Sequence, residues 1–207
     1  MSVLGKSEMN LQQYKALWIV VTAVLALLVA SPALQRVLVY PQTDFFTELS
    51  LLGPGHMAED YPFNITQNEN YTVYLGITNH LGSCAYYEVQ VKFRNETESA
   101  PNSFNQAAST LPSLYNVSAF VADKESWELP VTFSFDYSLF NKNQVVFNSL
   151  TFNGASLSLA GLSTDWNSTM SVFYGNLVFE LWIYNGATNT FQYNARFVDL
   201  KFNMTSN

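Results

Sequence analysis

The sequence predicts an all-β protein, an antiparallel immunoglobulin-like β-sandwich that is preceded by one N-terminal transmembrane helix. Several segments beyond residue 40 alternate apolar and polar residues with a period of two, which is typical of half-buried strands. The same region is rich in Phe, Tyr, Thr, Val and Asn, and no amphipathic helical pattern separates its alternating segments. An uncharged apolar segment near the N-terminus is long enough to cross a membrane.

The apolar segment extends from Ala16 to Leu34 and contains no charged residue. At about 1.5 Å per residue it forms a helix of roughly 28 Å, which matches the thickness of a hydrocarbon core. Trp18 and Tyr40 stand near its ends, where aromatic side chains favour the boundary between lipid and water. We therefore expect a transmembrane helix or signal anchor over residues 16–38.

The charges around this segment predict its orientation. Lys6 and Lys15 precede it, and only Arg36 follows it closely. Positive charge on the N-terminal side favours a cytoplasmic N-terminus. Residues 1–15 are then expected to be cytoplasmic, and residues 39–207 are expected to form an extracellular β-sandwich domain that is bound to the cell membrane by a single span.

Two routes of processing are alternatives to an uncleaved anchor. The small residues of Ser31-Pro32-Ala33 resemble a signal-peptidase site, and cleavage there would release a secreted domain. Lys15-Ala16 before an apolar run resembles the short signal of archaeal pilins, whose processing leaves the helix on the mature protein.

Six Asn-x-Ser/Thr sequons follow the apolar segment, with acceptors at Asn64, Asn70, Asn95, Asn116, Asn167 and Asn203. N-linked glycans are added outside the cytoplasm. The sequons therefore require a cytoplasmic N-terminus and an extracellular C-terminal domain, which is the orientation that the charges predict. A chain of this length with 20 Asn, 20 Ser and 15 Thr is expected to contain roughly three sequons by chance. The enrichment is about twofold and supports a glycosylated extracellular domain.

Alternation within single segments predicts the strands. In residues 87–94, Val89, Val91 and Phe93 share one face, and Glu88, Gln90 and Lys92 share the other. Such patterns predict about eight strands, including Phe45–Leu52, Tyr71–Asn79, Tyr87–Arg94, Leu129–Phe135, Gln144–Phe152, Leu177–Tyr184 and Thr190–Asn203. Residues 185–189 (Asn-Gly-Ala-Thr-Asn) form a predicted hairpin turn between the last two. Residues 95–113 lack periodicity and predict a long, exposed and flexible loop.

Composition excludes several classes of partner. Residues 41–207 hold six basic and fifteen acidic residues, a net charge of −9, so we expect no nucleic acid or anionic lipid as partner of this domain. Cys84 is the only cysteine, so no intrachain disulfide is possible. We interpret Cys84 as a small buried residue; a free, intermolecular or modified thiol is the alternative.

Two motifs carry a resemblance to a known family. The sequence L-G-P-G-x-x-A-E-D-Y-P begins at Leu52, and T-N-H-x-G begins at Thr78. With the segments around them, over most of residues 45–135, and the last hairpin, the chain resembles an archaeal domain-of-unknown-function family of membrane proteins with an extracytoplasmic β-rich domain. The resemblance implies location and fold, and the family has no established activity. From the residues themselves, both motifs are interpreted as turns, and Gly82 is expected at positive φ.

The residues contain no recognised catalytic or metal-binding motif. The candidates for metal ligands are His56, Glu59, Asp60 and His80, but their spacing matches no established ligand set, so we predict neither a metal nor another cofactor. No nucleophile elbow, zinc-protease motif or phosphate-binding loop is present, so we predict that the protein is not an enzyme.

Aromatic residues off the alternating core are the candidates for binding a ligand. Trp182 and Tyr184 lie on the face opposite Leu181 and Ile183, and an exposed pair there would form an apolar patch suited to stacking on a sugar. We expect instead that a second sheet packs over this face. Trp127 and Trp166 are further candidates of the same kind.

The leading functional hypothesis is a single-pass, glycosylated cell-surface protein with a binding or structural role in the cell envelope. Its expected partners are the membrane, N-linked glycans, and an envelope protein or a second copy of the chain. One alternative is a pilin-like or filament subunit, which processing after Ala16 and a polymeric form would favour. Another is a solute- or sugar-binding surface module, which an open aromatic cleft would favour.

Overall fold

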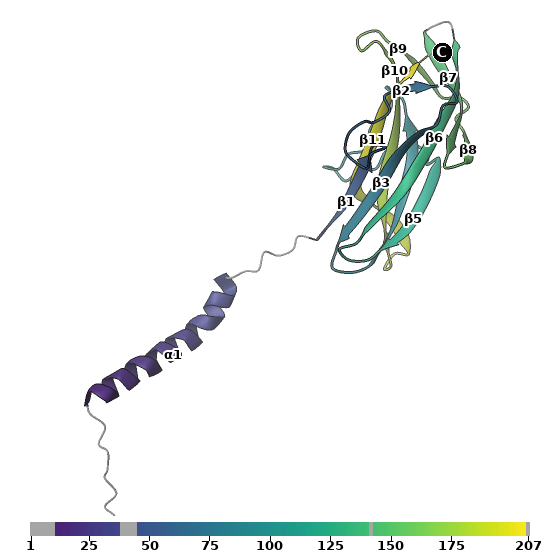
Figure 1. Ribbon diagram of the computed structural model, residues 1–207. Helices are drawn as coiled ribbons and strands as arrows, with labels where there is room; N and C mark the ends of the chain where they lie inside the picture. The colour runs from purple at the N-terminus through teal and green to yellow at the C-terminus, as the bar shows by residue number, and fades with distance from the viewer. Residues whose placement is uncertain (1–10, 38–44, 141–142, 206–207) are drawn as a thin grey trace, which may run out of the picture. The chain divides into compact units, whose positions relative to one another are not determined.

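A computed structural model describes residues 11–37, 45–140 and 143–205 (Figure 1). Of the helix, it describes the side chains of residues 14–30. Three sequence predictions concern residues outside the described part. These are the orienting charge of Lys6, the position of Tyr40 at the membrane interface, and the cleavage site at residues 31–33, whose side chains are not described. The chain divides into two compact units, Met1–Asp44 and Phe45–Asn207.

The first unit contains one helix, α1 (Leu11–Val37), which includes the apolar segment predicted from the sequence. Its described apolar side chains, among them Leu17, Ile19 and Leu28, are exposed. The hydroxyl of Thr22 donates to the carbonyl oxygen of Trp18, so this polar group is satisfied within the helix. Within the described residues, no helix meets the length and hydropathy required of a membrane span.

The second unit is all-β and is built almost entirely of antiparallel strands. The strands are β1 (Phe46–Leu52), β2 (Asn64–Thr66), β3 (Tyr71–His80), β4 (Ala85–Arg94), β5 (Tyr115–Val121), β6 (Ser126–Phe140), β7 (Gln144–Phe152), β8 (Ala155–Ser158), β9 (Ser163–Asn167), β10 (Val172–Asn185) and β11 (Thr190–Thr205). In β3 and β4, buried side chains alternate with partly exposed ones, as the sequence pattern predicts.

The strands form one curled sheet whose two halves face each other. One half has the order β1-β3-β6-β7, with β8 and β9 paired to β7, and the other has the order β5-β4-β10-β11 with β2 beside β11. Only the β2–β11 pair is parallel among the pairs of named strands. Strand β9 also pairs with the start of β10, so it links the two halves at one end of the domain (Figure 1).

Aromatic side chains fill the space between the two halves. Phe135 of β6 is fully buried and lies with its ring centroid 5.1 Å from that of Phe202 and 6.0 Å from those of Phe93 and Phe147. These rings come from both halves, so the apolar face of each half is buried against the other. Burial of this core is the main favourable contribution to folding.

Asn79 connects the turn between β3 and β4 with the end of β5 at one end of the core. Its buried carboxamide nitrogen donates to the carbonyl oxygens of Ser83 and Val121, both at 2.8 Å, and its Oδ1 accepts from the Leu81 amide at 3.0 Å. The hydroxyl of Tyr87 also reaches Asn79 Oδ1, at 3.2 Å. Burial raises the pKa of Tyr87, although its hydrogen bond to Thr47 acts in the opposite direction. The Asn in T-N-H-x-G is therefore a structural residue.

The loop of residues 53–61 after β1, which we call the Gly53 loop, also has a structural explanation. A Cβ on Gly53 would lie 1.9 Å from the carbonyl oxygen of Glu59, so no larger residue fits there without a shift of the backbone. The Gly53 amide donates to Met57 O at 2.7 Å, and the hydroxyl of Tyr61 donates to Leu51 O at 2.6 Å. These contacts close the loop back on the end of β1.

The structure confirms an all-β domain and the residues of the main predicted strands. The prediction of positive φ at Gly82 is also confirmed, at 75°. Four strands were missed, namely β2, β5, β8 and β9. Three of these have five residues or fewer, too short for alternation to show, and β5 adjoins the irregular segment that obscured its start.

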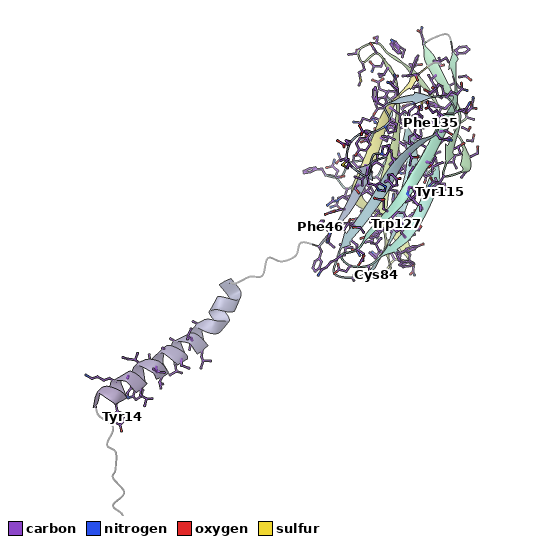
Figure 2. The ribbon with its side chains drawn as sticks, in the orientation of Figure 1. Tyr14, Phe46, Cys84, Tyr115, Trp127 and Phe135 are labelled. Atoms are coloured by element: carbon purple, nitrogen blue, oxygen red, sulfur yellow. The ribbon has the colours of Figure 1, made fainter. Side chains whose placement is uncertain are left out.

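The interpretation of Cys84 as a buried residue was wrong. Cys84 is exposed, in the turn between β3 and β4 (Figure 2). The turn reverses the chain at Gly82, which leaves the residues before β4 at the surface rather than in the core.

Replacement of Phe135 by Ala is expected to lower the free energy of unfolding by about 3–5 kcal/mol, because it removes a ring that is packed on every side and leaves a cavity. Phe104 is 95% exposed and provides the matched control, so Phe104→Ala is expected to change stability by less than about 0.5 kcal/mol. Urea unfolding of the purified domain measures both. Equal effects of the two variants would contradict the assigned core.

Candidate functional site

The outer face of the β5-β4-β10-β11 half carries the chemically distinctive residues of the domain. As predicted, Val89, Val91 and Phe93 point into the core. The alternate residues of β4 and β10 therefore point outward, Lys92 and Glu180 among them. This face is divided into a covered part and an exposed part.

A buried ion pair lies in the covered part. Lys92 Nζ is 2.8 Å from Glu180 Oε2, and the two side chains are only 4% and 0% exposed. The Ser109 amide donates to Glu180 Oε1 at 2.9 Å, and Lys92 Nζ donates to the Ser109 carbonyl oxygen at 3.2 Å. A buried ion pair needs such further hydrogen bonds to offset the loss of hydration. Ser109 thus fixes the segment between β4 and β5 over the sheet.

The segment of residues 95–113 is therefore an attached cover rather than a loop without contacts. As predicted, it contains no strand; an isolated bridge joins Asn102 to Ala107. Its first turn is held by Glu98, whose carbonyl oxygen accepts from Arg94 Nε at 2.7 Å. Most of its side chains are exposed, and Phe104 extends into solvent.

Four aromatic side chains form a row across the exposed part of the same face. We call Phe120, Tyr86, Tyr184 and Phe191 the aromatic row, since each lies on one of the adjacent strands β5, β4, β10 and β11. Tyr86 stacks on Phe120 with centroids 4.2 Å apart, and it lies 6.0 Å from Tyr184 and 5.2 Å from Phe191. Tyr86 therefore lies within 6.0 Å of each of the other three rings, and the four side chains form one contiguous group across the four strands.

The aromatic row is accessible from solvent. Phe120 is 72% exposed and Tyr184 is 39% exposed, while Tyr86 and Phe191 are half-buried between their neighbours. The rings contact one another edge-on or by stacking, so they form a ridge rather than a flat platform. Exposed clusters of Tyr and Phe are typical of the centres of protein interfaces.

The row ends at an unpaired strand edge. Within the described residues, β5 pairs only with β4, so no neighbouring strand uses the amide and carbonyl groups on its other side. Its sequence, Tyr-Asn-Val-Ser-Ala-Phe-Val, contains no charge and no proline, the usual devices that block pairing with another strand. The face and the edge together provide apolar and main-chain contacts at one place.

The sequons gather at the opposite end of the domain. Asn203 contacts Asn64 across the β11–β2 pair, and it also accepts from the Phe173 amide at 2.9 Å. Val172 pairs with Asn167, and the carboxamide of Asn167 reaches Glu96, next to Asn95. Asn70 precedes Tyr71, whose hydroxyl accepts from the Thr66 amide of β2 at 2.9 Å. Five of the six sequons are thus neighbours, and Asn116 on β5 is the exception.

The length of β10 separates the two ends. Val172, at its start, lies among the sequons, and Tyr184, twelve residues later, belongs to the aromatic row. Asn203 pairs with Tyr174, ten residues before Tyr184, and Asn95 follows Tyr86 of the row by nine residues. At about 3.3 Å per residue these sequons therefore lie about 30–40 Å from the row. Figure 2 shows Phe46 and Cys84 at the end of the domain that carries the row, and Figure 1 shows β2 and β9 at the other.

The structure does not bring the metal candidates together. His56 Nδ1 lies 2.9 Å from Glu128 and its ring stacks on Tyr74, whereas His80 Nε2 lies 3.7 Å from Glu48 and its ring stacks on Phe46. Glu59 and Asp60 are exposed in the Gly53 loop. Within the described part of the chain, no three His, Cys, Asp or Glu side chains form a cluster suited to a metal ion.

The two aromatic ligand candidates have different environments. Trp182 is half-buried beside the ion pair, with Lys92 Nζ 5.9 Å from its ring, and its Nε1 has no hydrogen-bond partner among the described residues. Tyr184 belongs to the exposed row.

The face that carries Trp182 and Tyr184 is covered in part by residues 95–113 and not by the second sheet that was expected from the sequence. Phe120 and Phe191 were missed, because the cross-strand register that aligns them with Tyr184 is not visible in the sequence.

A groove lies between β11 and the segment that includes the end of β1 and the loop after it. Its lining includes Leu51 from β1, Tyr61 from the loop after β1, and Phe197, Asp199 and Lys201 from β11. Asp199 accepts from Asn176 Nδ2 at 2.9 Å and lies 3.8 Å from Lys201, so its charge is used within the fold. The groove contains no cluster of reactive groups among the described residues.

Replacement of Glu180 by Ala is expected to lower the free energy of unfolding by about 3–5 kcal/mol, because Lys92 is then buried without its partner. The double variant Lys92→Met with Glu180→Leu is expected to recover most of this loss. Lys201→Ala breaks only the exposed pair with Asp199 and should cost about 1 kcal/mol or less. Urea unfolding measures all three, and an effect of Glu180→Ala no larger than that of Lys201→Ala would contradict the buried pair.

The solved structures that resemble this chain include two distant neighbours. The CARDB domain of a Pyrococcus furiosus protein, in complex with di-metal ions, is 10% identical with a TM-score of 0.35, over 77% of this chain and 90% of that chain. A β-glucosidase from Listeria innocua, in complex with isofagomine, is 9% identical with a TM-score of 0.35, over 81% of this chain and 17% of that chain. No curated protein sequence matches the chain.

A family model matches residues 41–157, which is more than half of the chain. The match contains the Gly53 loop, the Asn79 turn and strands β1 to β7, and it ends within β8. The resemblance to a family of unknown function with a β-rich domain, predicted from those two motifs, is thereby confirmed. The chain belongs to the family described as Domain of unknown function (DUF1616).

Proposed function

We propose that the protein is a single-pass, membrane-anchored and glycosylated cell-surface protein whose extracellular domain binds an envelope protein through the aromatic row and the β5 edge. One observation carries this proposal. The exposed aromatic surface lies about 30–40 Å along the strands from the end where five sequons gather, so glycans there leave the row accessible. The proposed role is binding, with no catalytic step.

The chemistry of the row supports a protein as the partner. An extended segment of another chain that pairs with β5 gains main-chain hydrogen bonds, and an apolar side chain on it packs against Phe120. The rings stand edge-on to one another, an arrangement that suits side chains better than the flat face of a sugar. A glycan on Asn116, four residues from Phe120 on the same face of β5, would limit the docking surface on one side.

The sequence of the first unit supports the proposed anchor. The segment from Ala16 to Leu34 has no charge and includes four residues whose side chains lie outside the described part. Its described apolar side chains are exposed within α1, and a hydrocarbon environment would bury them. The orientation with a cytoplasmic N-terminus and an extracellular second unit is the one that makes the sequons usable.

The order of the strands supports an immunoglobulin-like sandwich. The halves β1-β3-β6 and β11-β10-β4-β5 correspond to the A-B-E and G-F-C-C′ arrangement of that architecture, with β7, β8 and β9 between the counterparts of E and F. Such domains present binding surfaces at their ends and edges on many cell surfaces. An archaeal origin, which the resemblance suggested, is part of the same proposal.

Peptide mass spectrometry on the protein from its native membranes tests the anchor and the orientation. We expect peptides that begin before Ala16 together with glycosylated sequon peptides, because an uncleaved anchor keeps its N-terminus and exposes the second unit to glycosylation. Protease added outside intact cells should remove the second unit and spare residues 1–15.

Three outcomes would contradict the anchored glycoprotein. A mature N-terminus at Leu17 would indicate a filament subunit. A start after Ala33 would indicate a secreted domain. Six bare sequons would remove the argument for an extracellular location.

A further inference from the structure

The carboxamides of the six sequons differ in whether the fold uses them. A glycan is attached to the Nδ2 atom of Asn, so this atom must point into open space in the folded protein. Three of the six Nδ2 atoms donate to other parts of the protein, and the other three have no acceptor among the described residues.

Asn203 is the clearest case of a carboxamide used by the fold. Its Nδ2 donates to Asn64 Oδ1 at 3.1 Å, and its Oδ1 accepts from the Phe173 amide at 2.9 Å. Asn203 lies on β11 between β10 and β2, with Asn64 directly opposite, and its side chain is half-buried. Two branched sugars on carboxamides in contact would occupy the same space, so one folded molecule accommodates a glycan on Asn64 or on Asn203 only.

Asn95 and Asn167 join the segment after β4 to β9. Asn95 Nδ2 donates to the Ser163 carbonyl oxygen at 3.3 Å, and its Oδ1 accepts from the Thr97 amide at 3.0 Å. Asn167 Nδ2 donates to Glu96, and its Oδ1 accepts from the amides of Thr169 and Met170 at 3.0 and 2.9 Å. Both carboxamides are half-buried in turns that they stabilise.

Asn64, Asn70 and Asn116 have the opposite character. All three are exposed, and within the described residues nothing accepts a hydrogen bond from their Nδ2 atoms. Asn64 and Asn116 use only Oδ1, as acceptors from Asn203 and from Ser113. A sugar on any of these three nitrogens displaces no contact of the fold.

We infer that Asn64, Asn70 and Asn116 are the glycan acceptors of the folded protein, and that Asn95, Asn167 and Asn203 are structural residues that stay bare. The inference rests on the proposed function for the presence of glycans, and it assigns their sites. The motif Asn-x-Ser/Thr alone does not distinguish the two groups, because their difference lies in contacts between distant segments.

A variant that keeps only the Asn64 and Asn203 sequons tests the most specific part. Thr72→Ala, Thr97→Ala, Ser118→Ala and Thr169→Ala remove the other four sequons while leaving every asparagine in place. The intact mass of this full-length variant, purified from the native cell, is expected to show one glycan, and peptide mapping is expected to place it on Asn64. The matched control keeps Asn64 and Asn70 through Thr97→Ala, Ser118→Ala, Thr169→Ala and Thr205→Ala, and two glycans are expected.

The outcomes separate the inference from the proposed function. Molecules of the first variant with two glycans, or with one on Asn203, would overturn the inference while leaving the glycosylated surface protein in place. Occupied Asn95 or Asn167 in the unmodified protein would do the same. A control variant and an unmodified protein that are both bare would overturn the proposed glycosylation, and the assignment of sites would fall with it.

Discussion

The buried ion pair between Lys92 and Glu180 determines which surface the domain presents. Two charges removed from water lose several kcal/mol of hydration each, and their mutual attraction offsets this only when further hydrogen bonds complete the site. Ser109 supplies those bonds, so the segment before β5 is held on the outer face of β4 and β10. This cover buries the middle of the face and leaves the aromatic row as its exposed apolar part.

The separation of the two ends follows from the lengths of the strands. β10 and β11 have 14 and 16 residues and run along the domain, so the residues at their two termini lie at opposite ends of it. Five sequons surround the start of β10, and the aromatic row crosses its end. In the proposed role, glycans on Asn64 and Asn70 would protect one end from proteolysis and leave the aromatic row at the other end accessible, and a glycan on Asn116 would border the docking surface on β5. That combination carries the proposed role better than any single residue does.

Much of this fold could be predicted because alternation within a strand is a local property. Leu75, Val91 and Phe133 lie in the core as their spacing predicts, and the turn at residues 185–189 joins β10 to β11 as expected. The candidate site was predicted only in part. Tyr184 was identified from alternation, but Phe120 was not, because its strand was missed and cross-strand register depends on distant residues.

The charged and polar contacts were the least predictable. Lys92 lies on the polar face of β4, and nothing near it in the sequence shows that Ser109 and Glu180 return to bury it. Asn79 was interpreted as a turn residue, whereas it is fully buried and joins the β3–β4 turn to the end of β5. In both cases a polar side chain is satisfied by segments far along the chain, which a local pattern does not reveal.

Site-specific photocrosslinking in intact cells tests the docking surface most directly. A photoreactive amino acid at Phe120 is compared with the same amino acid at Phe104, which is equally apolar and more exposed but lies outside the row. The proposed role predicts a discrete adduct with one envelope protein from position 120 and none from position 104. Equal labelling from both positions, or an adduct from position 104 alone, would contradict the aromatic row as the binding surface.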